Sequence, residues 1–301
     1  AFQGDHGAYS EEAVAAWWEG AAVPVPAREC ADVARLVESG DVDHGVLAIE
    51  NTLAGSVVAA YDALAAAAGV TVVGEVVLPM HHCVLAPPGA TLATVATVES
   101  HPVALAQCGR FLAAHPHIEA RAAYDTAGAA RAVAARDDGR AGAIAGRGAA
   151  QRFGLVVLAA NVEDRPDNQT RFLVLARGGA PLSASSGPPA PDRGAPAGAP
   201  LVHTGHMRTA LIAVTDNVPG ALLHLLAPLA AAALNVSKIE SRPTGVPWAY
   251  RFFVEVEHDA DDPRLGDALA AVRGAARDLR VLGTFERARP AAGSAVGGLD
   301  G

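Results

Sequence analysis

The chain has 301 residues, more than one hydrophobic core usually organises, which excludes a single small module and favours two folded units. Hydrophobic residues make up 51% and charged residues 18%, so the chain can bury enough apolar surface to fold and is not wholly disordered. Asp and Glu total 32 against 23 Lys and Arg, a formal net charge of -9, which argues against a nucleic-acid partner.

The cysteines and the apolar stretches indicate in which cellular compartment the protein is expected. Cys30, Cys83 and Cys108 are far apart, which provides neither a disulfide framework nor a CxxC pair and favours a reducing, cytoplasmic setting. The longest apolar stretch, Ala221 to Val236, is shorter than the ~20 residues of a membrane helix, so we expect no membrane partner. The start of the chain lacks the basic and apolar regions of a secretory signal.

One composition change divides the chain. Residues 178–206 consist mainly of Gly, Ala, Pro and Ser and have little to bury, which predicts a linker. The linker separates an N-terminal unit, residues 1–177, from a C-terminal unit, residues 207–287. A Gly/Ala-rich flexible tail is expected at residues 288–301.

Short apolar runs alternate with helical patterns in the N-terminal unit. Strands are predicted at Val46 to Ile49, Val70 to Val77, Val95 to Val98, Ala143 to Ala145, Leu155 to Leu158 and Phe172 to Leu175. Helices are predicted to begin near Ser10, Asp32, Gly55-Ser56, Ser100 and Asp125-Thr126. This alternation indicates an α/β fold, in which helix N-termini at one sheet edge suit a small anionic ligand.

The C-terminal unit has a different order of elements. We expect a strand, a helix, two strands, a helix and a strand at Thr209 to Val214, Pro219 to Ala233, Asn235 to Ser241, Trp248 to Glu257, Pro263 to Asp278 and Arg280 to Phe285. The order βαββαβ is that of a ferredoxin-like unit.

Polar residues stand at the entrance to the last strand of the N-terminal unit. Asn168, Gln169 and Thr170 precede the apolar run, and strand alternation places Thr170 and Arg171 on opposite faces. Thr170 by itself is also an ordinary strand former, and Arg171 an ordinary edge charge.

Two further turns could present donors to a ligand. Glu50 to Ser56 leads from a buried strand through Asn51, Thr52 and Gly55 toward a helix. Ser100-His101-Pro102 opens the helix that carries Gln107. In both turns the hydroxyls are also plausible N-caps, and capping is compatible with ligand contact.

Taken together, these segments resemble the motifs of prephenate dehydratases. They are, in order, Gln3 to Glu11, Ile49 to Val57, Ser100-His101-Pro102 with Ala104 to Cys108, and Asn168 to Leu173. Beyond the linker, Pro219 to Leu222 and Asn235 to Pro243 resemble the paired signatures of the ACT regulatory domain. Val103 and Thr52 depart from the family pattern, which usually has Gln and Ser at these positions.

The resemblance implies a fold and a reaction. The catalytic domain would have two lobes like a periplasmic binding protein, followed by a ferredoxin-like ACT domain. The reaction would be the decarboxylative dehydration of prephenate to phenylpyruvate in phenylalanine biosynthesis, catalysed by a carbon–oxygen lyase. It needs no metal or organic cofactor, L-phenylalanine would act as the effector, and a homodimer or homotetramer is expected.

The resemblance also assigns roles to residues. The catalytic signature falls on Thr170, Arg171 and Phe172, although from the residues alone Arg171 could pair with a substrate carboxylate or with a structural acid. Substrate contacts fall on Ala8, Tyr9, Ser10, Asn51, Thr52, Gly55, Ser56, Ser100 and Asn168. Phenylalanine contacts fall on Asn217, Pro219, Gly220, Ala221, Leu222, Glu240, Ser241 and Arg242.

Three other functions remain open at this point. Arogenate dehydratases share these motifs and accept an amino group in place of the keto oxygen. A non-catalytic amino-acid sensor could have the same architecture, and a related decarboxylase could retain the hydroxyl. His81-His82 and His115-Pro116-His117 provide no convergent ligand set, so we expect no metal site and assign them structural or surface roles.

Overall fold

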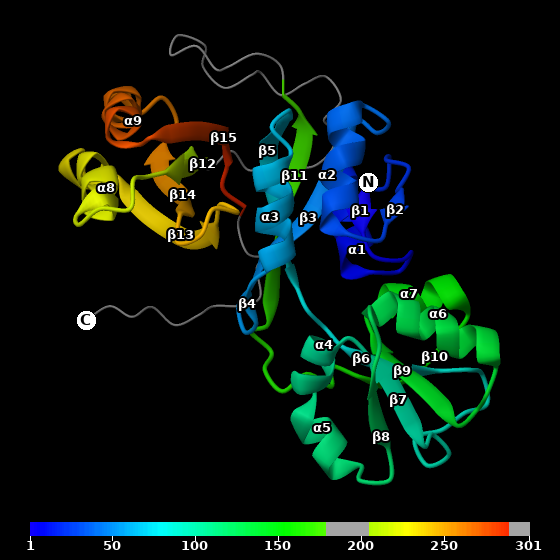
Figure 1. The fold of residues 1–301 in the computed structure, drawn as a ribbon. Coiled ribbons are helices and arrows are strands. Elements are labelled where there is room, and N and C mark those ends of the chain that lie inside the picture. Colours follow the sequence, from blue (N-terminus) through cyan, green and yellow to red (C-terminus); the bar gives the residue numbers. More distant parts are fainter. Residues whose placement is uncertain (179–204, 289–301) are drawn as a thin grey trace.

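The computed structural model describes residues 1–178 and 205–288. The N-terminal unit forms two lobes, each a sheet with helices packed against it, and the C-terminal unit lies beside the first lobe (Figure 1). The linker and tail expected at 178–206 and 288–301 lie largely outside the described residues. Within the described ranges, no helix has the length and apolar character needed to cross a membrane.

Lobe 1, residues 1–79 and 169–178, contains a mixed sheet of strand order β2-β1-β3-β11-β5, with β4 paired to β3. Its strands are β1 (Phe2–Gln3), β2 (Pro26–Ala27), β3 (His44–Asn51), β4 (Gly55–Ser56), β5 (Val70–Pro79) and β11 (Gln169–Arg177). Its helices are α1 (Tyr9–Trp18), α2 (Cys30–Ser39) and α3 (Val58–Ala66). Strand β11 lies antiparallel between β3 and β5, which places Thr170 opposite both Asn51 and Leu78.

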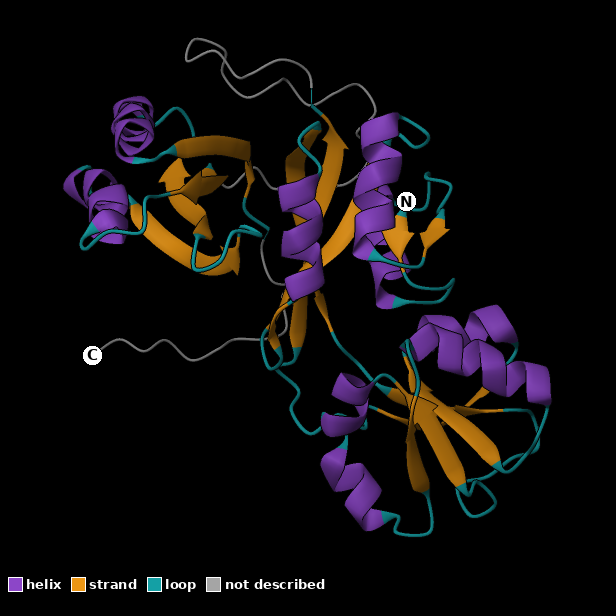
Figure 2. Ribbon diagram, viewed as in Figure 1, coloured by secondary structure: helices purple, strands orange, loops and turns teal. Residues whose placement is uncertain are grey.

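Lobe 2, residues 83–160, has a sheet of strand order β10-β6-β9-β7-β8. Its strands are β6 (Cys83–Ala86), β7 (Thr97–Ser100), β8 (Glu119–Ala122), β9 (Ala141–Ala145) and β10 (Val156–Ala160). Its helices are α4 (Pro102–Ala106), α5 (Gly109–Ala114), α6 (Thr126–Arg136) and α7 (Arg147–Phe153). The chain crosses between the lobes twice, at residues 80–82 and 161–168 (Figure 2).

The predicted α/β class is confirmed, and the differences have local causes. Strand β8 was not expected because its residues are polar or small and all four are exposed, so it has no apolar run. Gly55 and Ser56 form β4 rather than opening a helix, and α3 begins at Val58. Ser100 is the last residue of β7, and His101 caps α4 instead by accepting the Val103 amide at its Nδ1.

The predicted βαββαβ order of the C-terminal unit is also confirmed. Its elements are β12 (His206–Val214), α8 (Ala221–Ala231), β13 (Asn235–Pro243), β14 (Tyr250–Asp259), α9 (Pro263–Ala275) and β15 (Asp278–Glu286). The antiparallel sheet has the order β13-β14-β12-β15. Helices α8 and α9 cover one face of the sheet, which leaves the other face for lobe 1 (Figure 1).

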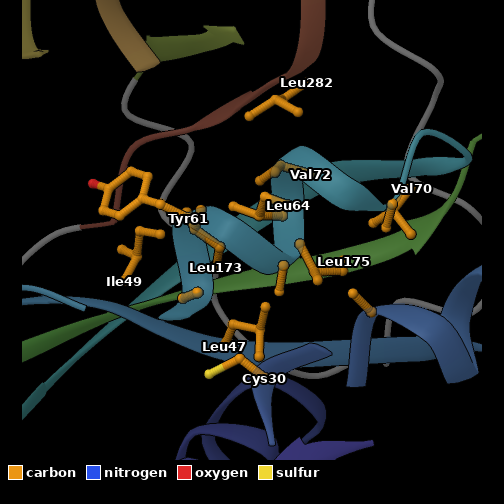
Figure 3. Close-up of a cluster of buried hydrophobic side chains, with 14 of the residues drawn as sticks. Cys30, Leu47, Ile49, Tyr61, Leu64, Val70, Val72, Leu173, Leu175 and Leu282 are labelled. Atoms are coloured by element: carbon orange, nitrogen blue, oxygen red, sulfur yellow. The ribbon is translucent and has the colours of Figure 1, made fainter. Parts of the chain in front are cut away.

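Lobe 1 and the C-terminal unit share one hydrophobic core. Phe253 and Leu282 belong to the same buried cluster as Leu47 and Tyr61, and Leu282 lies beside Val72 in Figure 3. A hydrogen bond also joins the two units, because the Thr71 hydroxyl donates to the Leu282 carbonyl at 2.6 Å. The sheet of lobe 1 that carries Thr170 is therefore packed directly against the C-terminal unit.

Candidate active site

Thr170 lies near the start of β11, where the chain returns from lobe 2 to lobe 1. Its side chain is 7% exposed, and its Oγ1 accepts a hydrogen bond of 2.9 Å from Asn51 Nδ2. Asn51 is the last residue of the neighbouring strand β3, and the register of the two strands places the pair face to face. The polar end of β3 and the polar start of β11 therefore lie side by side, next to the segment that crosses between the lobes.

Backbone donors fix the orientation of the Asn51 amide. The N–H groups of Leu53 and Ala54 donate to Asn51 Oδ1 at 3.0 and 2.9 Å. The oxygen must therefore face the turn, and the Asn51 amide nitrogen must face Thr170. Thr170 Oγ1 accepts from this nitrogen, and within residues 1–178 and 205–288 no side-chain acceptor takes the threonine proton, which can be donated to a ligand.

Three side-chain amides form a closed ring beside Thr170. Asn51 Nδ2 donates to Asn168 Oδ1 at 2.8 Å, and Asn168 Nδ2 donates to Gln107 Oε1 at 2.9 Å. Gln107 Nε2 completes the ring by donating to Asn51 Oδ1 at 3.2 Å. Hydrogen bonds that follow one another in this way polarise each other, so the amide ring holds the Asn51 donor in place.

Thr52 supports the same turn through the backbone. Its Oγ1 donates to the Asp167 carbonyl at 3.2 Å and accepts from the Gln169 amide at 3.0 Å. These bonds join the β3–β4 turn to the segment that enters β11. Thr52 therefore positions the cluster rather than capping a helix.

The first helix reaches the cluster indirectly. Ala8 is the N-cap of α1, and Ser10 is buried in the first turn. The Tyr9 hydroxyl lies 2.8 Å from His82 Nδ1, and His82 Nε2 lies 3.0 Å from Gln107 Oε1. Tyr9 is thus connected to Thr170 through His82 and the amide ring.

Arg171 faces away from the Thr170 cluster, as strand alternation predicts. Its guanidinium lies 3.2 Å from Glu50, 3.1 Å from Glu75 and 2.9 Å from Glu255 of the C-terminal unit. Burial works against the charge, but Glu255 and Glu75 outweigh it and raise the pKa of Arg171. Of the two alternatives left open for Arg171, the structure supports pairing with structural acids.

Phe172 and Ser100, both expected at the catalytic site, are buried elsewhere. Phe172 is 1% exposed and belongs to the apolar core around Phe2. Ser100 Oγ donates to the Ile144 carbonyl at 2.5 Å inside lobe 2. Their motif positions reflect packing around the site rather than direct contact with Thr170.

Gly55 pairs with Asn51 across β3 and β4, whereas Ser56 pairs with Glu50 and has its side-chain partners outside the cluster. Gly55 is exposed in β4 with a φ of 79°, a left-handed conformation that favours glycine. Ser56 Oγ donates to Glu240 Oε2 at 2.6 Å and accepts from Lys238 Nζ at 2.9 Å. Because β4 turns toward the C-terminal unit, Ser56 belongs to the contact between the units.

The expected effector residues fall into two groups. Asn217, Pro219, Gly220, Ala221 and Leu222 lie at the start of α8, and all except the half-buried Ala221 are exposed. Along β13, Glu240 and Arg242 contact Ser56 and Asp62 of lobe 1, whereas the intervening Ser241 is exposed. The structure therefore brings Glu240 and Arg242 to lobe 1 rather than to each other.

Sequence reasoning did not assign site roles to Gln107 and His82. Gln107 of lobe 2 donates to Asn51 of lobe 1, and His82 is linked to Asn51 through Gln107. The available signal was that Gln107 shares a helical segment with the Ser-His-Pro motif. His82 precedes a buried strand, and its spacing gives no indication of a partner.

Comparison with known proteins decides the family. The prephenate dehydratase family model matches residues 1–180, and the ACT domain model matches residues 209–274. The chain belongs to the prephenate dehydratase family. Its C-terminal unit is an ACT domain.

Two relatives illustrate the family's range. A prephenate dehydratase from Mycolicibacterium vanbaalenii is 36% identical over 265 residues, covering 87% of this chain and 78% of its own. Arogenate dehydratase 2 of Petunia hybrida is 36% identical over 300 residues, covering 95% of this chain and 71% of its own.

Solved structures share the arrangement of both lobes and the ACT domain. The L-Phe complex of the Arthrobacter aurescens prephenate dehydratase has a TM-score of 0.82 at 29% identity, covering 95% of this chain and 89% of that one. A protein described as the quorum quenching acylase GqqA has a TM-score of 0.81 at 33% identity, covering 95% of this chain and 97% of that one.

Proposed function

We propose that this prephenate dehydratase acts on prephenate itself and that Thr170 donates a hydrogen bond to the departing C4 oxygen. The observation that carries the proposal is the polarity of the Asn51–Thr170 bond. Because Asn51 Nδ2 donates to Thr170 Oγ1 at 2.9 Å, the threonine O–H points its proton elsewhere. A donor held in this way stabilises the charge that develops on a leaving oxygen.

The conversion of prephenate to phenylpyruvate requires few catalytic groups besides this donor. The ring carboxylate leaves as carbon dioxide, its bonding electrons enter the ring, and the C4–O bond breaks to release hydroxide, which becomes water by taking a proton from solvent. Aromatisation drives these steps, so the catalyst needs to orient the substrate and assist the departing hydroxide. A decarboxylase that retains the hydroxyl would have no use for a donor at this oxygen.

An acylase activity finds no support in this cluster. Acyl transfer by a hydroxyl requires an adjacent general base that removes its proton. The described side chain within hydrogen-bond distance of Thr170 Oγ1 is the Asn51 amide, which donates and cannot act as a base.

Substrate choice is tested by measuring turnover of prephenate and arogenate side by side. The two substrates differ in a keto oxygen against an amino group, and their products, phenylpyruvate and phenylalanine, are separable by chromatography. Greater kcat/KM for prephenate supports the proposal. Greater kcat/KM for arogenate would reassign the substrate, and release of carbon dioxide with a hydroxylated product would indicate a decarboxylase.

L-phenylalanine is proposed as the effector and a cytoplasmic homodimer or homotetramer as the assembled form. The ACT domain exposes several large apolar side chains, including Leu223 at 68% and Trp248 at 78%, which suits an assembly surface. Analytical ultracentrifugation and activity assays with and without L-phenylalanine test both points. A monomer at micromolar concentration, or turnover insensitive to millimolar L-phenylalanine, would contradict them.

A further inference from the structure

We propose that His82 is a positioning residue for the proposed reaction and acts as a neutral imidazole protonated on Nε2. It would hold the Gln107 amide, and through Gln107 the Asn51 donor, in the orientation that frees the Thr170 proton. The inference rests on the proposed function for its kinetic consequences, but the hydrogen on Nε2 follows from the hydrogen bonds alone.

His82 is 3% exposed and has one partner at each ring nitrogen. Its Nε2 lies 3.0 Å from Gln107 Oε1, and its Nδ1 lies 2.8 Å from the Tyr9 hydroxyl. The ring lies at the interlobe crossing, directly before β6. Tyr9 belongs to lobe 1 and Gln107 to lobe 2, so His82 joins side chains from both lobes.

The tautomer follows from the two backbone donors at Asn51. Because Leu53 and Ala54 fix Asn51 Oδ1, Gln107 must turn its nitrogen toward Asn51 and its oxygen toward His82. Gln107 Oε1 can only accept, so His82 Nε2 must carry a hydrogen. In the neutral ring Nδ1 is then bare, and the single proton of the Tyr9 hydroxyl has two acceptors within reach, His82 Nδ1 at 2.8 Å and the His81 carbonyl at 2.9 Å.

The surroundings keep both groups in these states. Burial lowers the pKa of His82 and favours the neutral ring, although the Gln107 bond and Glu163 act in the other direction. Burial raises the pKa of Tyr9 well above its ordinary value, so the phenol keeps the proton that it donates. Glu163 accepts the His82 backbone amide at 2.8 Å and also lies 2.9 Å from His81 Nδ1.

Two substitutions of His82 test the roles of its two ring nitrogens separately. The amide nitrogen of His82→Gln lies where Nε2 lies and can still donate to Gln107, whereas that of His82→Asn lies nearer Nδ1 and cannot reach it. We expect His82→Gln to keep kcat within about tenfold of wild type and His82→Asn to lose about 100-fold, because small misplacement of a catalytic donor has effects of this size. KM should change less than kcat in both variants.

A double-mutant cycle tests whether His82 acts through Gln107. In the Gln107→Leu background, His82→Asn should cause almost no further loss of kcat, since the group that it positions is already absent. Multiplicative losses, or wild-type kcat in His82→Asn, would overturn the proposal. Thermal unfolding of each variant identifies any loss that comes from misfolding, and His82→Gln then serves as the folded comparison.

Nitrogen-15 NMR of the full-length protein gives a readout independent of turnover. The imidazole signal absent from the His82→Gln spectrum should have a protonated Nε2 and an unprotonated Nδ1 at pH 7. A protonated Nδ1 would refute the tautomer even if the enzyme is active. If neither prephenate nor arogenate is converted by wild type, the proposed function fails while the NMR measurement still decides the tautomer.

Discussion

Arg171 Nη1 lies 2.9 Å from Glu255 Oε2, so the residue next to Thr170 in β11 is paired with the ACT domain. Glu50, the neighbour of Asn51 in β3, joins the same ion cluster through Arg171 and through Lys238 of β13 at 2.7 Å. Both partners of the Asn51–Thr170 hydrogen bond are therefore adjacent in sequence to residues that contact the ACT domain. We therefore propose that a shift of the ACT domain would disturb β3 and β11 through these side chains.

Thr170 should be essential for turnover but not for folding. Thr170→Val keeps the shape of the side chain and removes the donor, so we expect kcat to fall by about 100- to 1,000-fold, the usual effect of losing one donor to a developing negative charge. Thr170→Ser, which retains a hydroxyl, should lose much less. The rate of phenylpyruvate formation measures both, and equal activity of the Val and Ser variants would exclude the donor role.

Arg171 should matter for stability because its guanidinium lies in a largely buried ion cluster. Arg171→Met leaves Glu75 and Glu255 buried with one fewer cation, and breaking a buried pair of this kind costs about 3–5 kcal/mol. Arg208 remains 2.6 Å from Glu75 and should keep the loss near the lower figure. Urea unfolding followed by circular dichroism measures the change.

A matched control for that measurement is Arg165→Met. Arg165 pairs with Asp167 on the surface, where its side chain is 61% exposed, so its removal should leave the urea midpoint unchanged. Similar midpoints for Arg171→Met and wild type would show that the buried cluster contributes nothing to stability.

Gly283 should be required for docking of the ACT domain. A Cβ at this position would overlap the Val72 carbonyl oxygen, because β15 lies directly against β5. Gly283→Ala should lower the thermal midpoint and accelerate proteolysis of the full chain. Gly266→Ala in α9 meets no neighbour within 4 Å and should raise helix stability by about 0.5–1 kcal/mol. Equal proteolysis rates for Gly283→Ala and wild type would argue against close packing there.

The stabilisation that the Glu50 carboxylate contributes should be lost in acid. Burial opposes its ionisation, but Lys238 and Arg171 outweigh burial and lower its pKa from 4.5. A carboxyl with a lowered folded-state pKa stabilises the fold above pH 4.5, and this contribution is lost as the pH falls through the folded value. The difference in thermal midpoint between wild type and Glu50→Gln should thus be constant near neutrality and shrink below pH 4.5. A difference that stays constant in acid would show that the ion pairs do not shift this pKa.

The sequence by itself determined the order of elements and which face of β11 each side chain occupies. Strand and helix patterns depend on neighbours a few residues away, so the βαββαβ order was predicted with boundaries close to those observed. Period-two alternation likewise separated Arg171 from Thr170, and the resemblance of the motifs to the family assigned Asn51, Asn168 and Thr170 to one expected site.

Only the tertiary structure decided the partners of these side chains. Asn51 and Thr170 are 119 residues apart, and Arg171 and Glu255 are 84 apart, so sheet register and domain packing bring them together. Gln107 and His82 entered the cluster for the same reason, whereas Ser56 and Ser100 found partners outside it. Local preferences act along the chain, but hydrogen-bond partners across it are fixed only when buried polar groups must all be satisfied in one fold.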